Sequence, residues 1–263
     1  MLKEFLRYAP GVKGVLRRRH RRHFLSEQGY ASHYGVYRSF AEARSDAPPS
    51  AEFDQVALAS EYTDRLERVF AYDYPVMLWL DKAMRAGARR VVDVGGNIGV
   101  HFFAYRHFFD YPPDLVWTVC EVPAIAEAGR EMMRDRGEPG LEFTSEFTPG
   151  LVEQADVLIS AGTLHYIEQP LLWDLLSAAL RWPEHVLLNK VPLYQGETFV
   201  TLQNIRRGYA PSWVWNRSEF LGAFQRQGYR AADGWSVPER HFWLPGHPER
   251  TFGAYSGVYL QRC

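Results

Sequence analysis

The sequence predicts an α/β protein with a doubly wound, mostly parallel seven-stranded sheet. Short apolar runs alternate with amphipathic stretches from residue 90 onward, and strands that are apolar on both faces are typical of a parallel sheet covered by helices. A glycine-rich loop follows the first run, and an acidic residue ends the second. Of the 263 residues, 46% are hydrophobic and 23% are charged, which excludes a mostly disordered, collagen-like or coiled-coil chain.

The apolar runs and the stretches between them define the elements in order. Strands are predicted over 90–94, 115–122, 141–144, 156–161 and 185–191. Helices are predicted over 99–109, 123–136 and 170–181. A further helix over 218–227 precedes the last, partly antiparallel strands of the same sheet, over 230–237 and 254–261.

The region before residue 90 is predicted to be helical. Its apolar spacing indicates one helix over 51–70, after the turn-forming segment 45–50, and a second from Pro75 to Gly87. We therefore divide the chain into residues 1–70, a basic arm with a helical extension, and residues 71–263, which hold the sheet.

The first 25 residues carry eight basic residues and one acidic residue, a net charge of +7, so the remainder carries −8. Apolar side chains alternate with the basic ones, as in a helix on a membrane surface, although Pro10, Gly11 and Gly14 interrupt the period. The arm is predicted to contact an anionic membrane surface, with a solvated or core-packed helix as the alternative. No basic stripe with interleaved aromatic residues occurs elsewhere, so no nucleic acid partner is expected.

The remaining composition favours the cytoplasm. The longest apolar stretch is about residues 75–80, whereas spanning a bilayer needs roughly 20 apolar residues, and no signal peptide is recognisable. The two cysteines, Cys120 and Cys263, lack CxxC spacing, which disfavours a disulfide or a cysteine zinc site. We expect a cytoplasmic protein that the arm places on the inner face of the membrane.

One segment joins a buried strand to a helix through three glycines and an asparagine, and it reads Val91-Val92-Asp93-Val94-Gly95-Gly96-Asn97-Ile98-Gly99-Val100. Glycine there permits positive φ and close approach of a bulky ligand. The spacing differs from the dinucleotide fingerprint G-x-G-x-x-G, and the lysine and Ser/Thr of a phosphate loop are missing. Glu121 ends the second strand, at the edge where open α/β sheets bind ligands, and can accept both hydroxyls of a ribose. Together these features predict a nucleoside cofactor.

The segment from Asp93 to Gly99 resembles motif I of the class I S-adenosylmethionine-dependent methyltransferases, a family with a Rossmann-like fold, and Glu121 matches its ribose-binding acid. The family usually has glycine where Asn97 stands, and asparagine tolerates the left-handed conformation. Further segments resemble a poorly characterised bacterial subfamily found among cell-surface polysaccharide biosynthesis enzymes. They are Gly35–Ala43, Tyr74–Val76, Gly162–Ile167, Val200–Asn204 and Ser212-Trp213.

The resemblance implies S-adenosylmethionine (SAM) as the cofactor and O- or N-methylation of a sugar or glycolipid precursor. The cofactor would be held by Asp93, Gly95, Gly96, Asn97, Gly99, Glu121, Ser160 and Ala161. Two alternatives stay open: a catalytically silent protein that binds the cofactor, and an NAD(P)-dependent oxidoreductase, which would be expected to show G-x-G-x-x-G.

Methyl transfer needs positioning, and a base only where the acceptor holds its proton. His165 follows the fourth strand, and its ordinary pKa near 6.5 suits proton acceptance, although a structural role is an equal alternative. Lys190, Tyr194 and Gln203 are candidate substrate contacts at the same edge. No metal is expected, because the histidines of each candidate pair, His101 with His107 and His241 with His247, are six residues apart, which does not place two ligands on one helix face.

Overall fold

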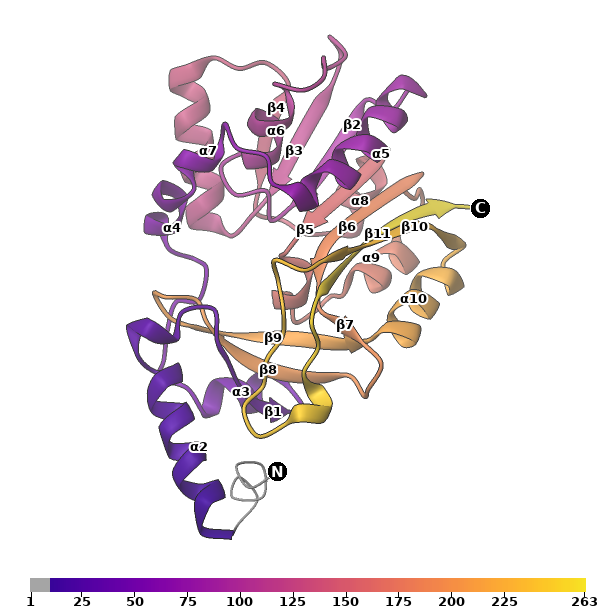
Figure 1. Ribbon diagram of the computed structural model, residues 1–263. Coiled ribbons are helices and arrows are strands. Elements are labelled where there is room, and N and C mark those ends of the chain that lie inside the picture. The colour runs from indigo at the N-terminus through magenta and orange to yellow at the C-terminus, as the bar shows by residue number, and fades with distance from the viewer. Residues whose placement is uncertain (1–9) are drawn as a thin grey trace.

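Two β-sheets organise the chain (Figure 1). The structure, a computed structural model, describes the backbone of residues 10–263 and the side chains of residues 15–59 and 61–263. The larger sheet has five parallel strands and two antiparallel strands at one edge. In spatial order they are β4 (Leu141–Thr144), β3 (Val116–Cys120), β2 (Arg90–Val94), β5 (Val157–Ala161), β6 (His185–Val191), β11 (Tyr255–Arg262) and β10 (Tyr229–Val237). The predicted mostly parallel, seven-stranded sheet is confirmed.

Helices cover both faces of this sheet. Successive strand residues point to opposite sides, so neighbouring residues of one strand pack into different clusters. Val91 and Ile159 belong to one buried cluster, and their neighbours Val92 and Leu158 belong to the other. The first cluster is completed by α5 (Tyr74–Arg85), α6 (Val100–Tyr105) and α7 (Pro123–Arg136). The second is completed by α8 (Pro149–Gln154), α9 (Leu172–Ala178) and α10 (Arg217–Arg226). The sheet is therefore doubly wound and Rossmann-like.

The second sheet, of four strands, was not predicted from the sequence. Its order is β1 (His33–Tyr37), β8 (Phe199–Asn204), β9 (Tyr209–Asn216) and β7 (Leu193–Tyr194). β1 pairs antiparallel with β8, so the first 70 residues contribute a strand as well as helices. A five-residue strand whose partner lies more than 150 residues away leaves no local periodicity to read. One face of this sheet is covered by α2 (Pro10–Phe24) and α3 (Phe40–Ser45).

The expected helix over 51–70 is broken into short pieces. They are α4 (Val56–Glu61) and the 3-10 turn η2 (Thr63–Arg65), and the 3-10 turn η3 (Ala71–Asp73) follows just after residue 70. The chain is anchored at Asp54, whose Oδ1 accepts a hydrogen bond of 2.8 Å from the backbone N of Ala124 on α7. After α4 the segment bends along the edge of a cavity, so one straight helix cannot form. The remaining short turns are η1 (Glu27–Gly29), η4 (Leu164–Tyr166) and η5 (Pro248–Arg250).

The basic arm forms α2 from Pro10 onward. Proline is tolerated at this position because it lies in the first turn of the helix. Residues 1–9 of the predicted membrane contact lie outside the described residues. Phe24, at the end of α2, is 2% exposed and packs against Tyr34 and Tyr209. Across residues 10–263, none of the helices combines the length and the apolar character that crossing a bilayer requires.

Candidate active site between the two sheets

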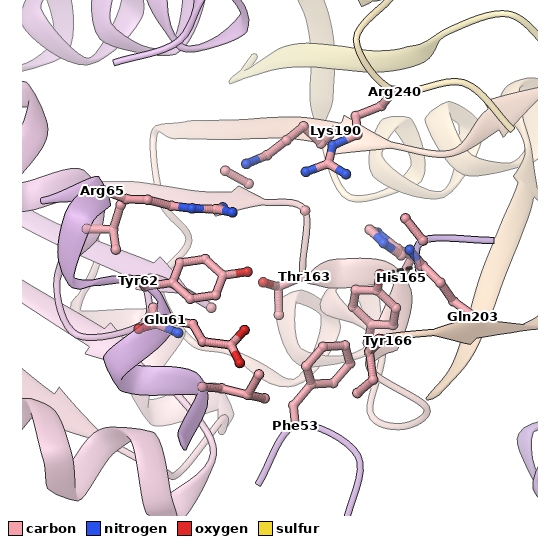
Figure 2. Close-up of a pocket in the computed structure, with 18 of the residues that line it drawn as sticks. Phe53, Glu61, Tyr62, Arg65, Thr163, His165, Tyr166, Lys190, Gln203 and Arg240 are labelled. Atoms are coloured by element: carbon pink, nitrogen blue, oxygen red, sulfur yellow. Dashed lines mark hydrogen bonds between the residues drawn. The ribbon is translucent and has the colours of Figure 1, made fainter. Parts of the chain in front are cut away.

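A cavity of about 1450 Å³ lies between the carboxyl ends of the parallel strands and the four-stranded sheet. From the larger sheet it is lined by residues that follow β2, β3 and β5 and by Lys190 near the end of β6. From the other side it is lined by β1, β8, η2 and the loop before β11. Figure 2 shows labelled side chains from several of these segments, among them Arg65, Lys190 and Gln203, around one common space.

The glycine loop adopts the backbone that its sequence predicts. Gly95 and Asn97 have φ of 80° and 53°, in the left-handed region. A Cβ on Gly95 would lie 1.8 Å from Thr163 Oγ1, so only glycine fits where this loop meets the end of β5. Gly95, Gly96 and Asn97 line the cavity, whereas Gly99 does not. Gly99, with φ of 92°, begins α6 and lies against Leu141.

Glu121 closes the loop from the neighbouring strand. Its Oε1 accepts from the backbone N of Asn97 at 3.0 Å, and its Oε2 accepts from the backbone N of Val122 at 3.0 Å. Burial raises the pKa of Glu121 to about 7, against the opposing effect of these two hydrogen bonds. Each oxygen keeps a further lone pair, so the carboxylate can receive a pair of neighbouring hydroxyls from the cavity.

Asp93 lies beneath the loop instead of lining the cavity, which corrects its expected place among the cofactor contacts. It is fully buried, and its Oδ2 lies 2.9 Å from Nδ1 of His101. Burial lowers the pKa of His101, but the Asp93 charge outweighs this effect and the net pKa is raised. A Cβ on Gly96 would come within 2.3 Å of Asp93 Oδ2. The Asp93–His101 pair therefore supports the glycine loop from beneath.

The end of β5 brings one of its two predicted cofactor residues to the cavity. Ala161 lines it, together with Gly162 and Thr163. Ser160 is fully buried, its Oγ has no hydrogen-bond partner, and it does not line the cavity. Because successive strand residues point to opposite sides, Ser160 and Ala161 cannot both face the same ligand.

His165 lies on η4, lines the cavity and is 3% exposed. Burial lowers its pKa to about 3, and the charges of Arg240 and Lys190 add to the effect. The imidazole is therefore neutral at pH 7, and its Nδ1 has no hydrogen-bond partner. Burial thus removes the basicity that the ordinary pKa of histidine would give, and it also encloses the unpartnered Nδ1.

Gln203 and Lys190 both line the cavity, as predicted. Gln203 Oε1 accepts from the hydroxyl of Tyr166 at 2.5 Å. Lys190 has φ of 55° and lies with its Nζ 5.0 Å from the centre of the Tyr72 ring.

Tyr194 is a correction, because the structure does not bring it to the cavity. Its hydroxyl donates to the backbone O of Glu197 and lies 3.2 Å from Arg250 Nη1, which donates to it. Its ring packs in a separate buried cluster with Phe199 and Phe252.

Several cavity residues were not found from the sequence. His33 on β1 is 5% exposed, its Nε2 is 3.5 Å from the Tyr255 hydroxyl, and burial lowers its pKa to about 3. Arg65 on η2 and Arg240 before β11 also line the cavity. None of these residues lies near the glycine loop in sequence. His33 depends on the unpredicted strand pairing, Arg65 on the broken helix, and Arg240 on the path of the loop between β10 and β11.

Comparisons with solved structures find methyltransferases of low sequence identity. The N-terminal domain of EvdMO1 with SAH bound shares 15% identity over 74% of this chain and 82% of that chain, with a TM-score of 0.48. A SAM-dependent methyltransferase from Aquifex aeolicus shares 13% identity over 80% of this chain and 99% of that chain, with a TM-score of 0.48. Magnesium protoporphyrin IX methyltransferase from Synechocystis PCC 6803 shares 12% identity over 94% of this chain and 100% of that chain, with a TM-score of 0.47. No protein-family model matches the chain, and no curated protein matches it by sequence.

Proposed function

We propose that the chain is a SAM-dependent methyltransferase. The observation that carries the proposal is the loop of Gly95, Gly96 and Asn97 at the cavity wall, with the Glu121 carboxylate held beside it by the backbone N of Asn97. A carboxylate with free lone pairs suits two ribose hydroxyls, and the glycines leave room for the rest of a nucleoside. When bound there, SAM would supply an electrophilic methyl group.

The cavity supports a second ligand beside the cofactor. Its volume of about 1450 Å³ exceeds the roughly 300–1,000 Å³ usual for one small-molecule site. We infer that the acceptor binds on the side of His165, Gln203 and Lys190, and that it is a sugar or glycolipid precursor methylated on oxygen or nitrogen. Polar side chains from both sheets face that part of the cavity, as hydroxyl-rich ligands require.

The residues of the chain would act mainly by positioning. His33 and His165 are both buried, so little of either side chain is open to solvent. A neutral His165 would accept the proton of an acceptor hydroxyl at Nε2, because Nδ1 is buried away from the ligand, and would release it to solvent after the oxygen gains the methyl group. Gln203, held by Tyr166, would orient the acceptor.

Calorimetric titration of the full-length protein tests the cofactor assignment. S-adenosylhomocysteine (SAH) should bind with micromolar affinity and NADH should not, because the loop lacks G-x-G-x-x-G. Binding of NADH without SAH would favour the oxidoreductase alternative. If SAH binds but methyl groups from labelled SAM never appear on extracted sugars or glycolipids, the protein is a silent binder.

We also propose that the chain is a cytoplasmic protein that docks on the inner face of the membrane through α2. Val15, Arg18, Arg19 and Arg22 are spaced i, i+3, i+4 and i+7, so they share one helix face, and all four are exposed. Another face of α2 contacts the rest of the protein, since Arg21 forms an ion pair with Asp46 at the end of α3. An exposed face of this kind suits anionic headgroups.

Because α2 packs on the second sheet, a charge change tests the membrane proposal better than a truncation. Full-length protein should co-sediment with phosphatidylglycerol vesicles at low salt. The triple variant Arg18→Gln, Arg19→Gln, Arg22→Gln should lose most of that binding, at roughly 1 kcal/mol per basic residue. A control with Arg85→Gln, Arg136→Gln and Arg226→Gln removes the same charge elsewhere and should still sediment. Equal sedimentation of the two variants would contradict the proposal.

A further inference from the structure

Three cations from distant segments meet on one side of the cavity. Arg65 comes from η2, Lys190 from the end of β6, and Arg240 from the loop between β10 and β11. All three are partly buried, and Figure 2 shows their charged ends turned toward the same space. Among the side chains that the structure describes, none of the three forms an ion pair or a side-chain hydrogen bond. By contrast, Arg44 at the cavity rim is paired with Glu52 at 2.7 Å.

The positions of these cations are set by their surroundings. The stem of Lys190 lies against Gly162, where a Cβ would come within 3.1 Å of Lys190 Cε. On the other side its ammonium group lies over the Tyr72 ring. The guanidinium of Arg65 lies 4.3 Å from the centre of the Tyr62 ring. Lys190 also adopts a left-handed backbone, which is uncommon for a residue other than glycine.

The nearby acids do not balance this charge. Asp73 is 4% exposed, and its Oδ2 accepts from the backbone N of Phe70 at 3.0 Å, while its Oδ1 has no hydrogen-bond partner. Glu61 is paired with Arg207, and Glu121 is held by backbone N–H groups. Asp64 and Glu239 also line the cavity, but both are exposed and neither forms an ion pair with one of the three cations. Among the described residues that line the cavity, Asp73 is therefore the one fully buried acid, against three cations.

Unpaired cations that are partly removed from water are costly unless an anion completes the site. Burial and the charges of Arg240 and Arg65 lower the pKa of Lys190 to about 8, against the raising effect of Asp73. A bound anion would relieve this repulsion. A carboxylate of the cofactor's amino acid part would offset one charge and leave an excess, whereas a phosphoryl group carries up to two charges and fits the arginine fork.

We propose that Arg65, Lys190 and Arg240 form a subsite for a phosphoryl group, so that the acceptor is a phosphorylated sugar or lipid-linked sugar. The inference rests on the proposed function for the identity of the neighbouring ligand. Arg240 and Lys190 also lower the pKa of His165, after the larger effect of burial, so an acceptor that brings negative charge would offset their part of the lowering. Phosphoryl binding and proton acceptance are then coupled in one site.

Calorimetry on the full-length protein, saturated with SAH, tests the subsite with inorganic pyrophosphate as the probe. Wild-type protein should bind pyrophosphate, and acetate should bind far more weakly. Lys190→Met and Arg240→Gln should each weaken pyrophosphate binding at least about tenfold while SAH affinity changes less than about twofold. The control Arg85→Gln removes an exposed charge on α5 and should change neither affinity.

The proposal is overturned if pyrophosphate fails to bind, if it competes with SAH, or if Arg85→Gln weakens it as much as the cavity variants. Loss of SAH affinity in Lys190→Met and Arg240→Gln would assign the cations to the cofactor instead. Should SAH not bind at all, the proposed function fails, and the same titration on the protein alone still decides the subsite. Glucose 1-phosphate and dihexanoyl phosphatidic acid then distinguish a sugar phosphate from a lipid phosphate.

Discussion

The two sides of the cavity are built in different ways. The glycine-loop side comes from a short stretch around β2 and the end of β3, in which the residues that matter lie within 30 positions of one another. The opposite side is assembled from β1, η2, β8 and the loop before β11, which span most of the chain. A site encoded locally can be read from sequence, whereas one assembled by long-range pairing needs the structure.

Among the substitutions that we predict, the largest effect on SAH binding and on stability is expected on the glycine-loop side. Gly95→Val introduces a β-branched residue at φ of 80° and drives its Cβ into Thr163. We expect SAH binding to fall below detection and the free energy of unfolding to drop by about 2–5 kcal/mol. Gly87→Val is the matched control, because Gly87 also has positive φ but nothing lies within 4 Å of an added Cβ. Normal SAH affinity in Gly95→Val would place the cofactor elsewhere.

The second effect concerns the acid beside the loop. Glu121→Ala should weaken SAH binding by about 1–3 kcal/mol, the cost of leaving ribose hydroxyls without a charged acceptor. Glu142→Ala, an exposed acid on the neighbouring strand β4, should leave the affinity unchanged. Calorimetry measures both variants. An unaltered affinity in Glu121→Ala would mean that this carboxylate does not hold the ribose.

The two sides should also respond to pH with opposite signs. The raised pKa of Glu121, about 7, means that the folded protein keeps a proton that the unfolded chain releases, so stability falls as pH rises from 4.5 to 7. The lowered pKa values of His33 and His165, each about 3, mean that the unfolded chain takes up protons first, so stability falls as pH drops below 6.5.

Each group contributes at most about 1.4 kcal/mol per pH unit within its window. Chemical denaturation of Glu121→Gln should therefore show a smaller loss of stability between pH 4.5 and 7. His165→Gln should lose less stability than the wild type between pH 6.5 and 4. The control His107→Gln, at an exposed position, should lose as much as the wild type. Parallel curves for wild type and His165→Gln would refute a histidine that is buried and neutral.

The smallest effect on stability is expected from a substitution at Tyr194. Tyr194→Phe removes a hydroxyl that bonds Glu197 and Arg250 outside the cavity, so stability should fall by about 0.5–1.5 kcal/mol. SAH and pyrophosphate affinities should not change. A substantial loss of either affinity would return Tyr194 to the site.

The sequence predicted the larger sheet closely, because its strands alternate with helices over short distances and each carries its own apolar pattern. Glu121 and the loop from Gly95 to Asn97 were predicted for the same reason. Asp93 and Ser160 were misplaced, since spacing does not reveal which side chain points beneath a loop. Arg65 and Arg240 were missed altogether, because no local pattern distinguishes a cavity cation from a solvated one.

A crystal structure of the full-length protein with SAH tests the central claim most directly. We expect the ribose hydroxyls within hydrogen-bond distance of the Glu121 carboxylate, the nucleoside against Gly95 and Gly96, and the space among Arg65, Lys190 and Arg240 left to solvent or an anion. SAH bound elsewhere, or with its carboxylate seated on those three cations and its ribose away from Glu121, would contradict the division of the cavity into a cofactor side and an acceptor side.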